Sequence, residues 1–221
     1  MEKFIHVDRC DSTQDLLKEQ LKEQKGVELT VSCEFQAHGH GRAERQWEDT
    51  PGTICFSMNI LPHQTPSFTA LELSLLVARF FETKGQSIKL KWPNDLLNKD
   101  MKKCGGILVQ SSDQLLLAGI GVNLYYPGEQ FGGVYETAFP LEKKSWVKDI
   151  SSFIRSHRYA DTQELIKDWS SRCIHLEKKV SISENDQEFS GLFKGLGTHG
   201  EALIETDQGP KHVYNGTLRL V

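Results

Sequence analysis

Hydrophobic and polar positions follow two different periods along this chain of 221 residues. Short runs rich in β-branched and aromatic residues predict strands, and apolar positions spaced three and four apart predict helices. Strands are expected over 4–7, 29–35, 52–60, 87–92, 104–110 and 115–124. Helices are expected from 11 onward, from 65 onward, and over 146–158 and 162–174.

The two helices in the first half have recognisable beginnings. Asp11 is expected to cap the first, with Gln14 three residues later as in a capping box. Gly26 is a plausible stop for that helix. Thr65-Pro66 is expected to start the second, with proline at the first helical position. Apolar residues surround most of this second helix, which predicts that it is well buried.

After Lys178 the pattern changes to short strands and turns, over 180–182, 189–196, 202–205 and 213–220. A tail of this kind predicts a small barrel-like domain. We place the boundary near Leu176, giving domains over residues 1–176 and 177–221. In the first domain strands arrive together and do not alternate strictly with helices. This favours an α+β fold with one mixed sheet and helices packed on it.

Composition excludes several classes of protein. The formal net charge is −4 with 25% charged residues, which is not the balance of a nucleic-acid-binding protein. Apolar runs are too short for a membrane helix, and the N-terminus lacks a signal-peptide core, so a cytoplasmic protein is expected. The five cysteines are dispersed without a Cys-x-x-Cys pair. Neither a disulfide framework nor a zinc site is expected.

The segment 34–47 combines flexibility with positive charge. Gly39 and Gly41 let backbone N–H groups approach a ligand closely. Arg42 and Arg45 add guanidinium groups whose geometry fits phosphate or carboxylate. Together with Trp47, these residues predict a loop that folds over an anionic ligand. The alternative is a solvated surface loop, and this stretch by itself does not decide between the two.

A second segment, Lys89-Leu90-Lys91-Trp92, alternates as a strand does, so both lysines share one face. Two solvent-facing lysines would be the ordinary interpretation of such a strand. Pro93-Asn94-Asp95 argues against it, because it ends the strand beside a polar turn. Gly119, Gly121 and Asn123 similarly share one face of a later strand. That face either leaves room for a ligand or is closely packed by a helix.

These segments together resemble the biotin–protein ligase family (biotin–[acetyl-CoA-carboxylase] ligase), in its form without a DNA-binding domain. The family's catalytic stretch, Lys-Trp-Pro-Asn-Asp, is complete at 91–95, and its glycine–arginine loop matches 39–47 in part. Asp11-Ser12-Thr13 agrees in order and spacing. The resemblance implies a class II synthetase-like α+β domain, a central mixed β-sheet with helices on one face, followed by a small SH3-like β-barrel.

The resemblance also implies roles for individual residues. Lys91 would hold the biotin carboxylate and the α-phosphate of ATP, and Arg42 would assist it in catalysis. Biotin would be bound by Ser12, Thr13, Gln36, Gly39, Lys91, Gly105 and Gly106. The adenylate would be bound by His40, Arg42, Arg45, Trp47, Asn94 and Asn123. Weaker candidates are Ser57, Asp95 and Gly121. Ser12 could equally cap a helix, and Asp95 could equally close a turn.

Three loop positions depart from the family pattern. His40 stands where arginine is usual, and Ala43-Glu44 replaces a pair such as Arg-Gly. Histidine is mostly neutral at pH 7, and Glu44 adds an opposing charge. Loop closure and ATP affinity are therefore the properties that these changes put in question.

The activity implied by the resemblance is ATP-dependent activation of biotin to biotinyl-5′-AMP. The biotinyl group would then pass to a lysine of a biotin carboxyl carrier domain, with Mg²⁺ assisting. An exposed sheet edge near Gly105 to Gln110 could pair with that domain or with a second copy in a homodimer. Alternatives are a lipoate–protein ligase and a non-catalytic biotin-binding module. DNA binding is not expected, because the match begins within the first dozen residues.

Overall fold

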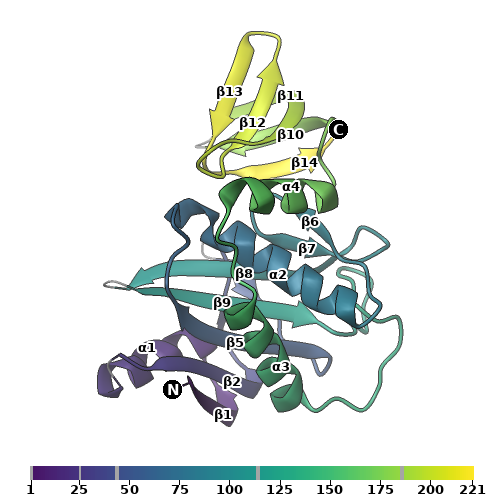
Figure 1. The fold of residues 1–221 in the computed structure, drawn as a ribbon. Coiled ribbons are helices and arrows are strands. Elements are labelled where there is room, and N and C mark those ends of the chain that lie inside the picture. Colours follow the sequence, from purple (N-terminus) through teal and green to yellow (C-terminus); the bar gives the residue numbers. More distant parts are fainter. Residues whose placement is uncertain (1, 25, 43–44, 113–114, 185–186) are drawn as a thin grey trace.

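The computed structural model describes residues 2–24, 26–42, 45–112, 115–184 and 187–221 (Figure 1). Within these residues the main sheet has seven strands. Its order is β1 (Glu2–Cys10), β2 (Glu28–Gln36), β5 (Thr53–Ile60), β9 (Leu115–Asn123), β8 (Lys103–Ser112), β7 (Asp95–Leu97) and β6 (Lys89–Lys91). The β1–β2 pair is parallel and the other pairs are antiparallel, so the sheet is mixed, as predicted.

Helices cover the sheet unequally. In Figure 1, α2 (Thr69–Thr83) and α3 (Lys143–Ser156) cross one face of it, and α2 begins after the 3₁₀ turn η1 (Pro66–Phe68). Most of α2 is buried, as its apolar circumference predicts. α1 (Thr13–Glu23) packs on the opposite face, where Leu17 joins Leu29, Val31 and Leu117 in a smaller apolar cluster.

Two candidate caps precede α1, and the structure selects Ser12 over Asp11. Ser12 is the N-cap residue, and its hydroxyl accepts a hydrogen bond from the Gln14 N–H at 3.2 Å. The polar run Asp11-Ser12-Thr13 offers alternative caps that local sequence does not rank. The strand β1 extends through Cys10, which places Ser12 at the cap position.

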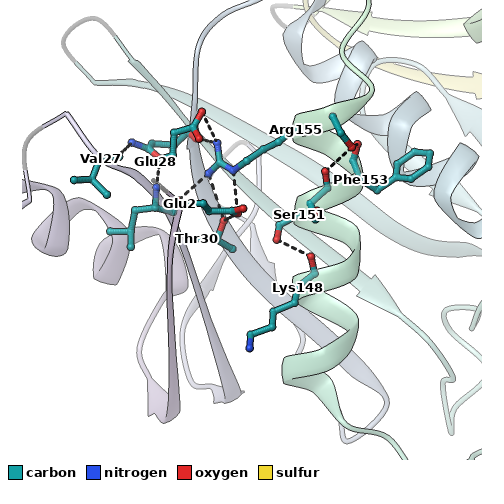
Figure 2. A network of polar contacts seen from close by, with 12 residues as sticks. Glu2, Val27, Glu28, Thr30, Lys148, Ser151, Phe153 and Arg155 are labelled. Atoms are coloured by element: carbon teal, nitrogen blue, oxygen red, sulfur yellow. Dashed lines mark hydrogen bonds and ion pairs between the residues drawn. The ribbon is translucent and has the colours of Figure 1, made fainter.

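Arg155, near the end of α3, fastens the helix to the outer strands (Figure 2). Its guanidinium donates to the Glu2 carboxylate at 3.1 Å and to the Asn59 carbonyl at 3.1 Å. It also donates to the Leu29 carbonyl at 3.3 Å. A rigid fork with five N–H donors suits such a junction of three strands. This contact holds β1, which pairs only with β2 in the described sheet.

The last part of the chain forms a second sheet, drawn in yellow-green above α4 (Thr162–Arg172) in Figure 1. Among the described residues it has five antiparallel strands in the order β13 (Gly209–Val213), β12 (Ala202–Thr206), β11 (Gln187–Leu196), β10 (Lys179–Glu184) and β14 (Thr217–Leu220). This agrees with the expected SH3-like domain. The run 213–220, predicted as one strand, is divided at Gly216, whose φ of +139° breaks the strand.

The second sheet is joined to the first through the strand that carries Lys91. The Ile174 N–H donates to the Leu90 carbonyl at 3.0 Å, beside a parallel bridge between Leu90 and Cys173. The indole N–H of Trp92, which is buried, donates to the Gly200 carbonyl at 3.2 Å. The C-terminal segment therefore supports β6 directly.

None of the helices in the described ranges is long and apolar enough to cross a lipid bilayer.

Candidate active site

A cavity of about 830 Å³ opens on the face of the main sheet that carries α1. Its wall is built by the glycine–arginine loop, by β6 to β9, by the linker after α4 and by β14. The volume lies in the range of small-molecule sites. Predicted site residues that line it are Ser12, Thr13, Gln36, His40, Arg42, Arg45, Trp47, Lys91, Asn94, Asp95, Gly106, Gly121 and Asn123.

Positive side chains outnumber negative ones in this wall. Its described basic residues are Arg42, Arg45, Lys91, Lys102, Lys103 and Arg219. Its described acidic residues are Glu48 and Asp95. Low-dielectric walls concentrate the field of such charges inside the cavity. The cavity is therefore suited to a ligand that carries several negative charges.

Lys91 reaches the cavity because β6 ends there. Leu90 and Trp92 are buried beneath the sheet, so the alternation turns Lys91 to the opposite face. Lys91 Nζ lies 3.9 Å from Asp95 Oδ2, and Lys103 Nζ lies 2.6 Å from Asp95 Oδ1. Asp95 thus holds two ammonium groups beside the cavity. Lys89 shares the face of Lys91 but is not part of the cavity wall.

The glycine–arginine loop is partly ordered into a short ladder, with β3 (Gly39–His40) paired to β4 (Gln46–Trp47). Arg42 donates to Asn94 Oδ1 at 3.1 Å and to Asn215 Oδ1 at 3.2 Å. Burial lowers the pKa of the Arg42 guanidinium from its ordinary value, and the Asp95 carboxylate opposes that shift. The loop is therefore linked by one side chain to both sheets.

Of the three loop positions that depart from the family pattern, the structure describes only His40. His40 Nε2 lies 2.8 Å from Asp15 Oδ2, so its ring contacts α1 at one side of the cavity. Ala43 and Glu44 lie outside the described residues, and their expected effect on closure stays a prediction.

Trp47 lies on the glycine face of the sheet. A Cβ atom at Gly121 would be 2.5 Å from Cε2 of the indole, so only glycine admits the ring there. At Gly119 a Cβ would be 2.6 Å from Gln14 Oε1 of α1. Of the two interpretations of this face, close packing therefore describes Gly119, where a helix side chain sits. Gly121 lies beneath the Trp47 side chain of the loop.

A connected polar cluster lies at the α1 end of the cavity. Gln36 Oε1 accepts from the Thr13 N–H at 2.8 Å and from the Thr13 hydroxyl at 3.1 Å. That hydroxyl also lies 2.9 Å from Ser57 Oγ. Such a network holds its side chains in defined orientations. Ser12 and Thr13 come from the helix start and Gln36 from the end of β2.

Three predicted residues do not line the cavity: Gly39, Ser57 and Gly105. Ser57 is buried behind Thr13. A Cβ at Gly39 would lie 2.2 Å from Gln36 Nε2, so this glycine allows close packing of the loop on the polar cluster. Asn123 lines the cavity, but both ends of its amide are already bonded. Its Oδ1 accepts from the Thr53 hydroxyl at 2.9 Å, and its Nδ2 donates to the Gly132 carbonyl at 3.3 Å.

Residues from the C-terminal half of the chain complete the wall, and no local sequence pattern signals them. They include His175 in the linker and Gly216 to Leu220 in and before β14. His175 is fully buried, and burial, followed by the charges of Lys91 and Lys178, lowers its pKa to about 4. Its imidazole is therefore neutral near pH 7.

This shift predicts a pH dependence of stability. An unfolded histidine titrates near 6.5, so between about pH 6.5 and pH 4 the unfolded chain binds a proton that the folded chain does not. Stability should fall as the pH falls through that window. His175→Phe should lose this part of the dependence, so its free energy of unfolding relative to the wild type should increase toward pH 5. Urea unfolding at several pH values measures the difference; a constant difference would contradict the assignment.

A mixed sheet with a strand-end lysine in a basic cavity, beneath an arginine-bearing loop, defines a site for binding and activating a small anionic substrate. The sequence profile described as the Biotin/lipoate A/B protein ligase family matches residues 6–125. The chain belongs to this family.

Known relatives align with most or nearly all of the chain. The bifunctional ligase/repressor BirA of Bacillus spizizenii is 25% identical over 98% of this chain and 74% of its own. The biotin–[acetyl-CoA-carboxylase] ligase of Paracoccus denitrificans is 26% identical over 81% of this chain and 85% of its own. The structure of the Aquifex aeolicus biotin protein ligase with biotin and ATP superimposes with a TM-score of 0.80, at 27% identity over 99% of both chains.

Proposed function

We propose that the protein uses ATP to activate biotin and transfers the biotinyl group to a lysine of a biotin carboxyl carrier domain. The observation that carries the proposal is Lys91 at the end of β6, inside a cavity whose described charges are mainly positive. The family match and the Aquifex aeolicus complex with biotin and ATP support the two small substrates.

In the first step a carboxylate oxygen of biotin attacks the α-phosphorus of ATP, and pyrophosphate leaves. Negative charge increases on the α-phosphoryl oxygens as the bond forms. Lys91 and Arg42, which line the cavity, would stabilise that charge, and preorganised cations do so without reorganising at the moment of reaction. The polar cluster of Thr13 and Gln36 would hold the ring of biotin at the α1 end.

In the second step the amine of the acceptor lysine attacks the mixed anhydride, and AMP leaves. Water would compete for the same carbonyl, so the loop must exclude it between the steps. Trp47 already covers the glycine face of β9, and Arg42 links the loop to Asn94 and Asn215. These contacts suit a lid.

Magnesium commonly binds nucleotide sites through phosphates, waters and one or two carboxylates. The carboxylates that line the cavity in the described residues are Asp95 and Glu48, and these would hold the ion. It would neutralise part of the charge on the phosphates. No group of three or more acidic, histidine or cysteine ligands occurs in the described part of the chain, so a metal site made by protein alone is not proposed.

Mass spectrometry of a carrier domain tests the proposal. After incubation with the protein, Mg-ATP and biotin, one lysine of the carrier should gain one biotinyl group. A parallel incubation with lipoate distinguishes the other activity that the family name includes. If the carrier domain were modified with lipoate and not with biotin, lipoate would be the substrate of the protein. Biotin binding without pyrophosphate release would instead identify a non-catalytic binding module.

Arg42→Gly should release the reaction intermediate. The change removes the bonds to Asn94 and Asn215, so the lid should open more often and free biotinyl-AMP should accumulate in solution. Chromatography of the supernatant measures it. His38→Ala is the matched control, because His38 is in the same loop but its side chain is 73% exposed and outside the cavity wall. If both variants released equal amounts of biotinyl-AMP, Arg42 would not be the residue that holds the lid closed.

A further inference from the structure

His175 is an unusual member of the cavity wall. Its side chain is fully buried, yet neither ring nitrogen has a hydrogen-bond partner among the described residues. Buried polar atoms in folded proteins are nearly always bonded, so each exception calls for an explanation, such as a functional role or a partner supplied from outside the chain. The ring packs on Phe193, with 5.6 Å between ring centroids.

The linker places this ring beside the catalytic strand. Ile174, the preceding residue, donates its N–H to Leu90, and the Lys178 N–H donates to the His175 carbonyl at 2.8 Å. Both backbone bonds restrict where the ring can go. His175 is close enough to Lys91 for the ammonium charge to affect its titration. Both residues line the same cavity.

The surroundings select the kind of group that His175 can bind. The charged groups that act on it are the ammonium groups of Lys91 on β6 and Lys178 on the linker. Both repel a cation, so the ammonium of an acceptor lysine is disfavoured here. A neutral imidazole offers one N–H donor, and an anionic oxygen would accept from it while also being attracted by both lysines.

From this geometry we infer that His175 donates a hydrogen bond to a phosphate oxygen of the bound nucleotide. This inference rests on the proposed function, which brings a triphosphate into the cavity. It makes His175 a nucleotide-binding residue contributed by the linker between the two sheets. It also gives one of the two unpartnered nitrogen atoms a role that packing of the ring against Phe193 leaves unexplained.

Proton abstraction from the acceptor amine is the competing role for a histidine at this position. A general base works best when its pKa is near the operating pH. The buried imidazole beside two lysines is held far below that range. The same lysines that disfavour protonation favour an anion as the hydrogen-bond partner, so donation to phosphate is the role that fits.

Kinetics of ATP–pyrophosphate exchange with three variants test the inference. His175→Phe keeps a ring against Phe193 and removes the donor. We expect it to raise the KM for ATP about tenfold to a hundredfold, since a hydrogen bond to a charged group is lost, and to leave the KM for biotin unchanged. His175→Gln and His175→Asn place an amide N–H near Nε2 and Nδ1, and one of them should restore much of the ATP affinity.

An exposed histidine elsewhere in the chain provides the control. His157 also stacks on a phenylalanine, Phe153, at 3.9 Å between ring centroids, but it lies at the end of α3, outside the cavity wall. His157→Phe should change neither KM. An unchanged KM for ATP in His175→Phe, or equal losses for ATP and biotin, would overturn the inference. Because the wild type still shows exchange in that case, the proposed function would stand.

Nuclear magnetic resonance of the wild type gives a measurement that does not depend on a variant folding. In protein labelled with ¹⁵N in its histidine rings, the His175 signals should shift when a non-hydrolysable ATP analogue is added after biotin. They should move little with biotin alone. Ring signals of His175 that do not respond to the analogue at saturation would reject the hydrogen bond. Absence of any binding of the analogue would instead reject the proposed function.

Discussion

Replacing Lys91 with alanine should slow biotinyl-AMP formation by about a hundredfold to a thousandfold, the usual cost of one preorganised donor at a developing charge. The ammonium group lies inside the cavity, 3.9 Å from Asp95, while the main chain of β6 is held by β7 and by Ile174. The fold should therefore remain intact. Pyrophosphate exchange measures the rate, and the thermal midpoint should stay within a few degrees of the wild type.

Lys89→Ala is a close control for this variant. Lys89 lies on the same strand and the same face, two residues away, but it is outside the cavity wall. The Lys89→Ala substitution removes the same charge from the protein without removing it from the cavity wall. Pyrophosphate exchange should therefore proceed at the wild-type rate. If Lys91→Ala were as active as Lys89→Ala, the central role of Lys91 would have to be given up.

Local sequence was enough to place the strand that carries Lys91. Alternation over 89–92 put Lys91 opposite buried neighbours, and the proline after it ended the strand, as the structure confirms. The broad apolar surface of α2 was likewise sufficient to predict its burial. These features depend on residues that are close in the chain. Periodicity reports such features well, because side chains on one face share one environment.

Other parts of the site depend on contacts between distant segments. His175 and β14 reach the cavity because the second sheet docks on β6, and neither has a local pattern that signals this. The short strand β7 was missed because its three residues pair with β6 and β8 without an alternating pattern of their own. The position of Trp47 on Gly121 also follows only from folding. The domain boundary near Leu176 remains a prediction.

The two sheets meet around one cavity, which explains why both contribute to it. Trp92 belongs to the same motif as Lys91, yet its indole is buried and donates a hydrogen bond to the Gly200 carbonyl, between β11 and β12 of the second sheet. Consecutive residues thus have separate environments. Lys91 lines the cavity with its charge, and Trp92 bonds the part of the chain that forms the second sheet.

Glu72→Ala should destabilise the protein by about 3 kcal/mol, the lower part of the range for breaking a buried ion pair. Glu72 is fully buried in α2 and accepts from Arg158 at 2.8 Å and 2.7 Å, and from the Tyr159 N–H at 2.8 Å. Its removal leaves these donors without their acceptor. We place the cost at the lower end because the Arg158 side chain is 24% exposed, so water can solvate part of it.

The same helix offers a matched control. Glu82 in α2 accepts two hydrogen bonds from Arg172, at 2.7 Å and 2.8 Å, but its side chain is 39% exposed. Glu82→Ala should cost less than about 1 kcal/mol, because solvent screens the pair and replaces its hydrogen bonds. Urea unfolding of both variants at one pH compares them directly, provided that the denaturant slope is unchanged. Equal losses would show that burial does not control the strength of these two carboxylate–arginine pairs.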